Sequence, residues 1–157
     1  MPLWPFAFVL QIAATPAEAH LFAAPACSHA ASFPAPFLEK RDGEVAEAKL
    51  TAPDLRLSAL CFTAQPGPSS AGEAQARLAS LAEQVGLAKA EILPLAMAGC
   101  AEARGDLTGR QPYKLIARLC LETSAVFMIE AVYLGEAQYE AARSFLDGIT
   151  VNAAPKN

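Results

Sequence analysis

The stretch PYKLIARLCLETSAVFMIEAVYLGEAQYEAARSFLDGI, residues 112–149, decides the fold of this 157-residue chain. Its first part, from Tyr113 to Leu121, alternates apolar and polar residues, which is the period-two pattern of a β-strand with one buried face. After Glu122, Thr123 and Ser124, the run Ala125–Leu134 is rich in β-branched and aromatic residues, which favours a second strand over a helix. The two runs together predict a long β-hairpin.

The length of the connection between these strands sets their expected register. If three residues connect them, Leu121 pairs with Ala125. One face of the hairpin then carries the pairs Leu121–Ala125, Leu119–Phe127, Ala117–Ile129, Leu115–Ala131 and Tyr113–Tyr133. A shift by one residue would move every side chain of one strand to the opposite face, so this register is a sharp prediction.

The second strand is also apolar on its other face, where Glu130 is the exception. The apolar residues of that face are Val126, Met128, Val132 and Leu134. A strand with two apolar faces is usually central in its sheet and covered on both sides. Gly135 ends the strand, and apolar residues then recur at helical spacing, which predicts a helix over Glu136–Asp147. We expect this helix to cover the Val126 face.

Turn residues and alternation predict three further strands, at about Glu44–Leu50, Leu55–Thr63 and Ile92–Arg104. Ser70 and Glu73 form a capping box that begins a helix before the last of these strands. We therefore expect one α+β domain over residues 37–151, with a mainly antiparallel β-sheet flanked by two helices. Residues 152–157 are expected to be a disordered tail.

The first nineteen residues have the pattern of a cleaved export signal. The apolar run Leu3–Ala14 is too short to span a bilayer, and it is followed by Pro16 and by Ala17-Glu18-Ala19, an A-x-A cleavage sequence. No Lys or Arg precedes Lys40, so the positively charged start of such a signal would consist of the terminal amine alone. A membrane anchor and a buried core segment are the alternatives. Cleavage would leave residues 20–36 as an extended leader. It would also place the mature protein in the periplasm or outside the cell, without a membrane span.

Composition and motifs argue against several classes of function. The formal net charge is −4 and the twelve basic residues are scattered, unlike the clustered Lys and Arg of nucleic-acid binders. The sequence contains no G-x-S-x-G, H-E-x-x-H, P-loop or G-x-G-x-x-G motif. Both histidines lie in the leader, which leaves the domain without the commonest general base. We predict no catalytic residue, no metal and no cofactor.

The four cysteines predict two disulfides, because short exported domains use such bridges. Three connectivities exist. Cys100 and Cys120 are equidistant from Arg110, in the middle of the connection between their strands, and both lie on polar faces, which favours Cys100–Cys120. Cys27–Cys61 follows by elimination and would pin the leader to the sheet. A bridge closing a loop of that size contributes roughly 3 kcal/mol.

Two places could carry chemistry. Glu130 interrupts an apolar face and is a candidate binding or catalytic carboxylate, and Arg118 is a second candidate binding residue. Alternatively Glu130 pairs with Arg118 or Lys114, or it faces solvent at a gap in the helix cover. Cys27 and His29 could touch one metal or form a Cys–His dyad, but the sequence offers no further ligand pair or orienting group for them. A disulfide cysteine beside an exposed histidine is the simpler interpretation.

The order of strand, strand, capped helix, strand, hairpin and helix resembles the PsbP-like family of α/β/α sandwiches. The likeness covers roughly residues 37–151 and is most specific from Tyr113 onward. The helix end Phe145-Leu146-Asp147-Gly148-Ile149 is similar to an aromatic-Leu-Asp-small-apolar ending in that family. Its members are mostly non-enzymatic partners of larger assemblies, so the resemblance implies binding and transfers no active site. The four cysteines are not part of the family pattern.

These observations lead to one functional hypothesis and one alternative. We expect an exported, disulfide-stabilised, non-enzymatic accessory module that binds a protein or a cell-envelope component. The alternative is a small hydrolase or ligand-binding protein that uses Glu130 or the Cys27/His29 pair.

Overall fold

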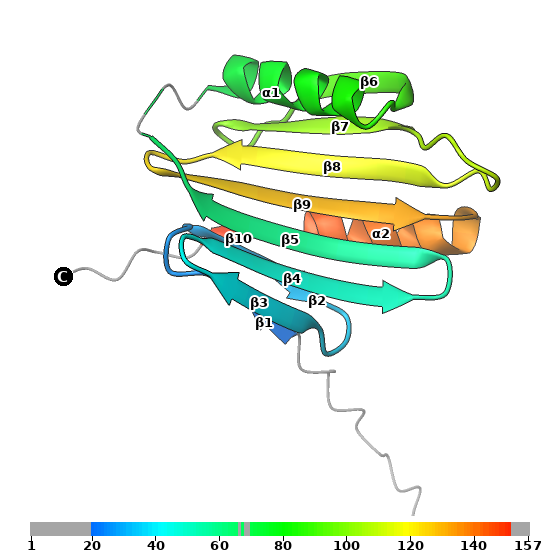
Figure 1. Cartoon of the computed structure of the whole chain (residues 1–157), viewed down its shortest axis with the longest axis horizontal. Helices are drawn as coiled ribbons and strands as arrows, with labels where there is room; N and C mark the ends of the chain where they lie inside the picture. The colour runs from blue at the N-terminus through cyan, green and yellow to red at the C-terminus, as the bar shows by residue number, and fades with distance from the viewer. Residues whose placement is uncertain (1–19, 66, 68–69, 152–157) are drawn as a thin grey trace, which may run out of the picture.

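A computed structural model describes residues 20–65, 67 and 70–151 (Figure 1). The expected export signal and the expected C-terminal tail lie outside these residues. The described chain forms a seven-stranded antiparallel sheet. In spatial order its strands are β3 (Leu38–Asp42), β4 (Val45–Ala52), β5 (Leu55–Thr63), β9 (Ala125–Tyr133), β8 (Lys114–Leu121), β7 (Cys100–Asp106) and β6 (Ala88–Pro94).

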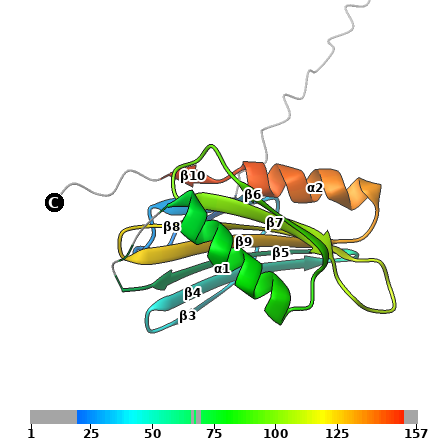
Figure 2. The same cartoon turned by 90° about the horizontal axis from the view of Figure 1, so that it is seen from above.

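Helices lie on both faces of this sheet (Figure 2). Helix α1 (Ala71–Gln84) packs on one face, across β6, β7 and β8. Helix α2 (Glu136–Asp147) packs on the other face against β9, β5 and β8. A small antiparallel sheet lies beside α2, with strands β1 (His20–Phe22), β2 (His29–Phe33) and β10 (Thr150–Val151), and β2 is its middle strand. The expected α+β class is confirmed.

The core consists of two apolar clusters, one on each side of β9. The cluster beneath α2 and the small sheet contains Phe127, Ile129 and Phe145. The cluster beneath α1 contains Val126 and Leu78. Strand β9 therefore buries side chains on both faces, and it is the central strand that the sequence predicts.

The register of the β8–β9 hairpin differs by one residue from the predicted one. Leu121 pairs with Val126, and Cys120 pairs with Phe127. The difference arises in the connection, where the backbone N–H of Glu122 donates to the carbonyl oxygen of Ala125 and closes the turn one residue later. As a result, the residues expected to share one face of the hairpin are divided between its two faces.

Helix α2 has the predicted bounds, but it covers the other face of β9 from the one expected. Phe145 and Leu146 of α2 pack in the same cluster as Phe127 and Ile129. Val126 belongs to the cluster beneath α1. Because α1 already covers the Val126 side of the sheet, the apolar face that remains for α2 is the Phe127 side.

Residues 20–36, expected as an extended leader, contain strands β1 and β2 and belong to the folded body. Phe22 and Phe33 are each 1% exposed and lie in the cluster beneath α2. The ring of Phe33 lies 4.8 Å, between centroids, from the ring of Phe145. These aromatic side chains hold residues 20–36 on the sheet. The free energy gained by burying them stabilises the folded conformation of this segment.

One predicted strand is a hairpin, and the strand predicted at Glu44–Leu50, which is β4, is preceded by a strand that was not predicted. The run expected as one strand over Ile92–Arg104 is divided between β6 and β7, with a turn in which Gly99 has φ of +70°. In the same way β3 precedes β4, and Gly43 in their turn has φ of +58°. Glycine adopts these left-handed conformations without steric cost, so each glycine permits a reversal that alternation alone does not predict.

Gly105 in β7 lies where the backbone approaches the α1–β6 connection closely. A Cβ atom at Gly105 would overlap the Leu87 side chain and lie 2.8 Å from the carbonyl oxygen of Ala88. We expect Gly105→Ala to lower the free energy of unfolding by about 1–3 kcal/mol, the usual cost of overpacking. Gly109→Ala is the matched control, because nothing lies within 4 Å of its Cβ position. Urea unfolding measures both variants, and equal effects would contradict the prediction.

Candidate functional site

The four cysteines form the two disulfides that the sequence favours. Cys100 of β7 and Cys120 of β8 are directly opposed in neighbouring strands and are bonded to each other. Cys27 is bonded to Cys61 of β5. With its sulfur in a disulfide, Cys27 offers no thiol, so the structure contains no Cys–His dyad of Cys27 and His29.

His29 is buried, whereas the sequence suggests an exposed side chain. Its Nδ1 lies 2.6 Å from Oε2 of Glu122, and the backbone N–H groups of Ser28 and His29 donate to the same carboxylate. Burial raises the pKa of Glu122, but these hydrogen bonds outweigh it, and the pKa is lowered overall. The imidazole also stacks on the ring of Phe127. These contacts fasten β2 to the β8–β9 turn.

Glu130 lines a narrow groove of about 130 Å³ between β9 and α1. The other residues that line this groove are apolar. The hydrogen-bond partner of Glu130 is Ser58, whose Oγ donates to Oε1 at 3.0 Å. The partners considered from the sequence are elsewhere: Lys114 pairs with Asp106, and Arg118 lies on the opposite face because of the shifted register.

Arg118 belongs to a buried ion-pair network beneath α2. Its Nε donates to Oε2 of Glu102 at 2.6 Å. Its other two nitrogens donate at 2.7 Å to the carbonyl oxygen of Leu146 and to the carboxylate of Asp147. The guanidinium group therefore ties the last turn of α2 to the sheet, which is a structural role.

Glu102 of β7 is the buried counter-charge of this network. It has no exposed surface, and it also accepts hydrogen bonds from Arg104 and Arg143. Burial by itself raises the pKa of Glu102, but the hydrogen bonds from Arg118 and Arg104, with the charges of Arg118 and Arg143, lower the pKa overall. Alternation places Glu102 on the same face as Cys100, but nothing in the sequence indicates three arginine partners.

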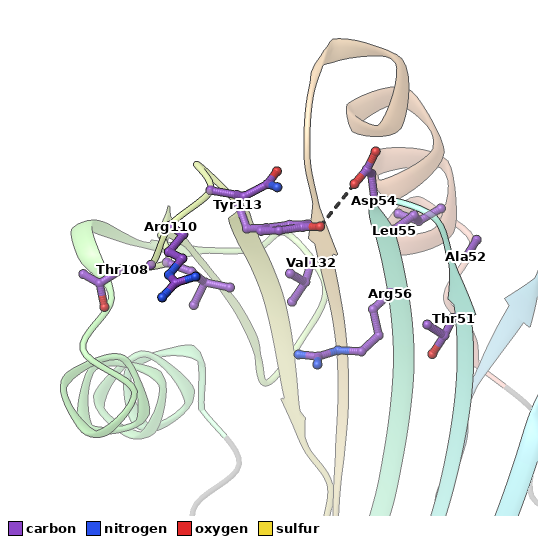
Figure 3. Close-up of a pocket in the computed structure, with 12 residues that line it drawn as sticks. Thr51, Ala52, Asp54, Leu55, Arg56, Thr108, Arg110, Tyr113 and Val132 are labelled. Carbon is purple, nitrogen blue, oxygen red and sulfur yellow. Dashed lines mark hydrogen bonds between the residues drawn. The ribbon is translucent and has the colours of Figure 1, made fainter.

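An open groove of about 520 Å³ lies at the end of the sheet where β5 begins (Figure 3). It runs between the β4–β5 turn and the β7–β8 connection. Its lining residues are Thr51, Ala52, Asp54, Leu55, Arg56, Leu107, Thr108, Gly109, Arg110, Gln111, Tyr113 and Val132. We call it the sheet-end groove.

Two guanidinium groups reach into the sheet-end groove. Figure 3 shows Arg56 extending from β5 and Arg110 extending from the β7–β8 connection, on either side of Val132. Both side chains are exposed, and among the described residues neither forms an ion pair. Tyr113 donates a hydrogen bond to Oδ1 of Asp54 at 3.1 Å, and this bond raises the pKa of Tyr113. The groove can therefore offer two cationic donor groups to an anion.

Sequence reasoning did not find this groove. Arg56 fits the solvent-facing position of an alternating strand, and Arg110 fits a turn. The two residues come together because β5 and β8 both pair with β9, so the start of β5 and the start of β8 lie on either side of the end of β9. The sequence would predict this site only if the order of the strands in the sheet were already known.

Comparison with known proteins supports the fold and adds no site. No protein-family model matches the sequence, and no curated protein matches it. The structure is similar to the solution structure of cyanobacterial PsbP (CyanoP) from Synechocystis sp. PCC 6803, with a TM-score of 0.54 and 12% sequence identity. The match covers 96% of this chain and 99% of that chain. The PsbP-like resemblance is thereby confirmed at the level of the fold.

Within residues 20–65, 67 and 70–151, no helix combines the length and the apolar character needed to cross a membrane.

Removing the charge of Glu102 is expected to weaken the fold. Glu102→Gln should lower the free energy of unfolding at pH 7 by about 3–5 kcal/mol, because the buried Arg118 loses its counter-charge. The folded-state pKa is lowered from the ordinary 4.5. The extra free energy of unfolding that the ionised Glu102 gives the wild type is therefore complete above pH 4.5 and is lost as the pH falls through the folded-state pKa.

Urea unfolding at pH 7 and at about pH 3 measures this effect. The matched control is Glu83→Gln, an exposed glutamate of α1, which should change stability by less than about 0.5 kcal/mol. A difference between wild type and Glu102→Gln that stays constant over this pH range would contradict the linkage.

Proposed function

We propose that this chain is an exported, non-enzymatic accessory module that binds a protein of the cell envelope, and that the sheet-end groove receives an acidic segment of that protein. The observation that carries the proposal is the convergence of Arg56 and Arg110 on one open groove without carboxylate partners among the described residues. Guanidinium groups bind carboxylates through paired, charge-assisted hydrogen bonds, so an acidic segment matches this chemistry.

The small free energy of a single exposed ion pair favours a ligand segment that makes several contacts. One exposed ion pair contributes about 0.2–1 kcal/mol, so a single carboxylate would bind weakly. The apolar side chain of Val132 lines the groove between the two arginines. A polypeptide segment that joins carboxylates to an apolar residue would use both parts of the lining.

The open shape of the groove supports a protein ligand over a small molecule. Sites for small molecules enclose about 70–90% of the ligand surface. Here the rim residues Thr51, Ala52 and Thr108 are exposed, so a bound ligand would keep one side in solvent. An extended segment of a larger protein tolerates that exposure.

Export is supported by two features of the chain. Its first nineteen residues have the pattern of a cleaved signal. The two disulfides are of the kind that persist in oxidising compartments. The PsbP-like fold is compatible with a role in protein interaction.

The alternative hypothesis, a hydrolase or ligand-binding protein centred on Glu130, has less support. The groove beside Glu130 has about 130 Å³, below the roughly 300 Å³ at which pockets for drug-sized ligands begin. Among the described residues that line it, Glu130 is the titratable one, so a second acid or base for hydrolysis does not face it.

The charge requirement of the sheet-end groove can be tested with a hexaglutamate peptide. We expect the peptide to shift the amide NMR signals of Arg56, Arg110 and Tyr113, and hexalysine to leave them unchanged. The double variant Arg56→Ala/Arg110→Ala should weaken binding by about tenfold, the equivalent of two exposed ion pairs. Added salt should weaken the wild-type complex, because exposed charges are screened within about 8 Å at 0.15 M.

The matched control is Arg41→Ala/Arg77→Ala, which removes two exposed arginines outside the groove. In capture from an envelope fraction, wild type and control should retain the same protein, and the groove variant should lose it. Failure of wild type to retain any protein above background would refute the accessory-module proposal. Equal retention by the groove variant would refute the assignment of the groove.

A further inference from the structure

His29, Cys100 and Cys120 form a cluster of potential metal ligands between β2, β7 and β8. Their ligand atoms all lie within 4.8 Å of one another. The three residues are buried, and the two cysteines have no exposed surface. The sequence suggests His29 and Cys27 as a ligand pair, but the fold brings His29 to the other two cysteines.

Glu122 orients the imidazole toward the two sulfur atoms. An ionised carboxylate only accepts hydrogen bonds, so the Nδ1 atom that contacts it at 2.6 Å carries the ring proton. In the neutral imidazole this hydrogen bond leaves the lone pair on Nε2, which lies 3.9 Å from Sγ of Cys100. Metal-binding histidines usually have this arrangement, in which one nitrogen donates to a carboxylate and the other coordinates the ion.

The redox state of the two cysteines controls whether their sulfur atoms can act as ligands. In the disulfide, the sulfur atoms of Cys100 and Cys120 are bonded to each other and carry no thiolate charge. A dithiol reductant transfers two electrons to this bond and is itself oxidised to a disulfide, and the cysteines become two thiols.

We propose that the reduced Cys100/Cys120 pair and His29 form a binding site for one soft cation, Zn²⁺ or Cu⁺. The ion replaces the two thiol protons, which are released to solvent, and it accepts the Nε2 lone pair of His29. A tetrahedral ion with Zn–S bonds of about 2.3 Å holds two sulfur atoms about 3.8 Å apart. Rotation of the two cysteine side chains supplies this separation while β7 and β8 stay paired.

Met97 distinguishes the two ions. Its Sδ lies 4.0 Å from Sγ of Cys120. Thiolate and thioether ligands together favour Cu⁺, whereas Zn²⁺ would take a water molecule as its fourth ligand. The bridge and the metal complex are thus alternative states of Cys100 and Cys120. This inference is independent of the sheet-end groove.

The test uses the full chain, reduced with a dithiol that is then removed by gel filtration under anaerobic conditions. Co²⁺ is the probe for a Zn²⁺ site, because bound thiolates give a thiolate-to-cobalt charge-transfer absorption. Competition with bicinchoninate measures Cu⁺. We expect the reduced protein to bind one equivalent of at least one of these ions and the oxidised protein to bind none at the cluster.

Variants separate this site from other ligands of the chain. His29→Asn should lower the affinity by at least about tenfold and Glu122→Gln by about 10–100-fold. His20→Asn is the matched control, because His20 is the other histidine of the sequence, and it should leave the affinity unchanged. Cys27→Ser/Cys61→Ser should keep the site, and Cys100→Ser/Cys120→Ser should abolish it.

Two results would overturn the proposal. One is the absence of both charge-transfer absorption and Cu⁺ retention in the reduced protein. The other is equal loss of affinity in the two histidine variants, which is the behaviour of ligands in an unfolded chain. If reduction unfolds the protein, far-UV circular dichroism decides: recovery of the native signal on metal addition supports the site, and no recovery rejects it.

Discussion

The pairing of β5 with β9 holds the two halves of this protein together. Strand β5 completes the meander that begins at β3, and β9 completes the one that begins at β6. The two strands are paired along their length, from Leu55 opposite Tyr133 to Thr63 opposite Ala125. Because β9 is apolar on both faces, each face of the sheet needs a cover at this point. Helix α1 covers one face of β9, and α2 together with the small sheet covers the other face.

The same pairing locates the polar features. Two carboxylates on the side of α2 and the small sheet have polar partners: Glu102 lies among arginines, and Glu122 accepts hydrogen bonds from the β2 segment and His29. An unpaired buried charge would cost several kcal/mol, so these carboxylates and their partners have a structural role. The sheet-end groove lies outside the covered area, and Arg56 and Arg110 form no ion pair with another residue of the described part of the chain. The proposed recognition site is therefore at the rim of the sheet and not in its interior.

Local sequence patterns predicted the helices and strands of this fold better than they predicted how these elements pair and pack. The bounds Leu55–Thr63 and Glu136–Asp147 follow from alternation and helical spacing, and the Cys100–Cys120 bridge follows from strand faces. The predicted hairpin register was wrong because the Glu122–Ala125 pair closes a turn one residue shorter than expected, and β9 is apolar on both faces, so alternation does not distinguish the two registers. Residues 20–36 show no periodicity, and their strands depend on aromatic contacts with α2. The convergence of Arg56 and Arg110 depends on strand order, which no local pattern contains.

The Cys27–Cys61 bridge closes the residues between its two cysteines into a covalent ring that includes β2, β3 and β4. The β2–β3 connection, with the exposed residues Pro34 and Pro36, lies within this ring. A protease that cuts the chain there produces two polypeptides that remain one molecule. After such a cleavage the aromatic side chains of the N-terminal fragment stay packed beneath α2. The fragment can dissociate only after the Cys27–Cys61 disulfide is reduced.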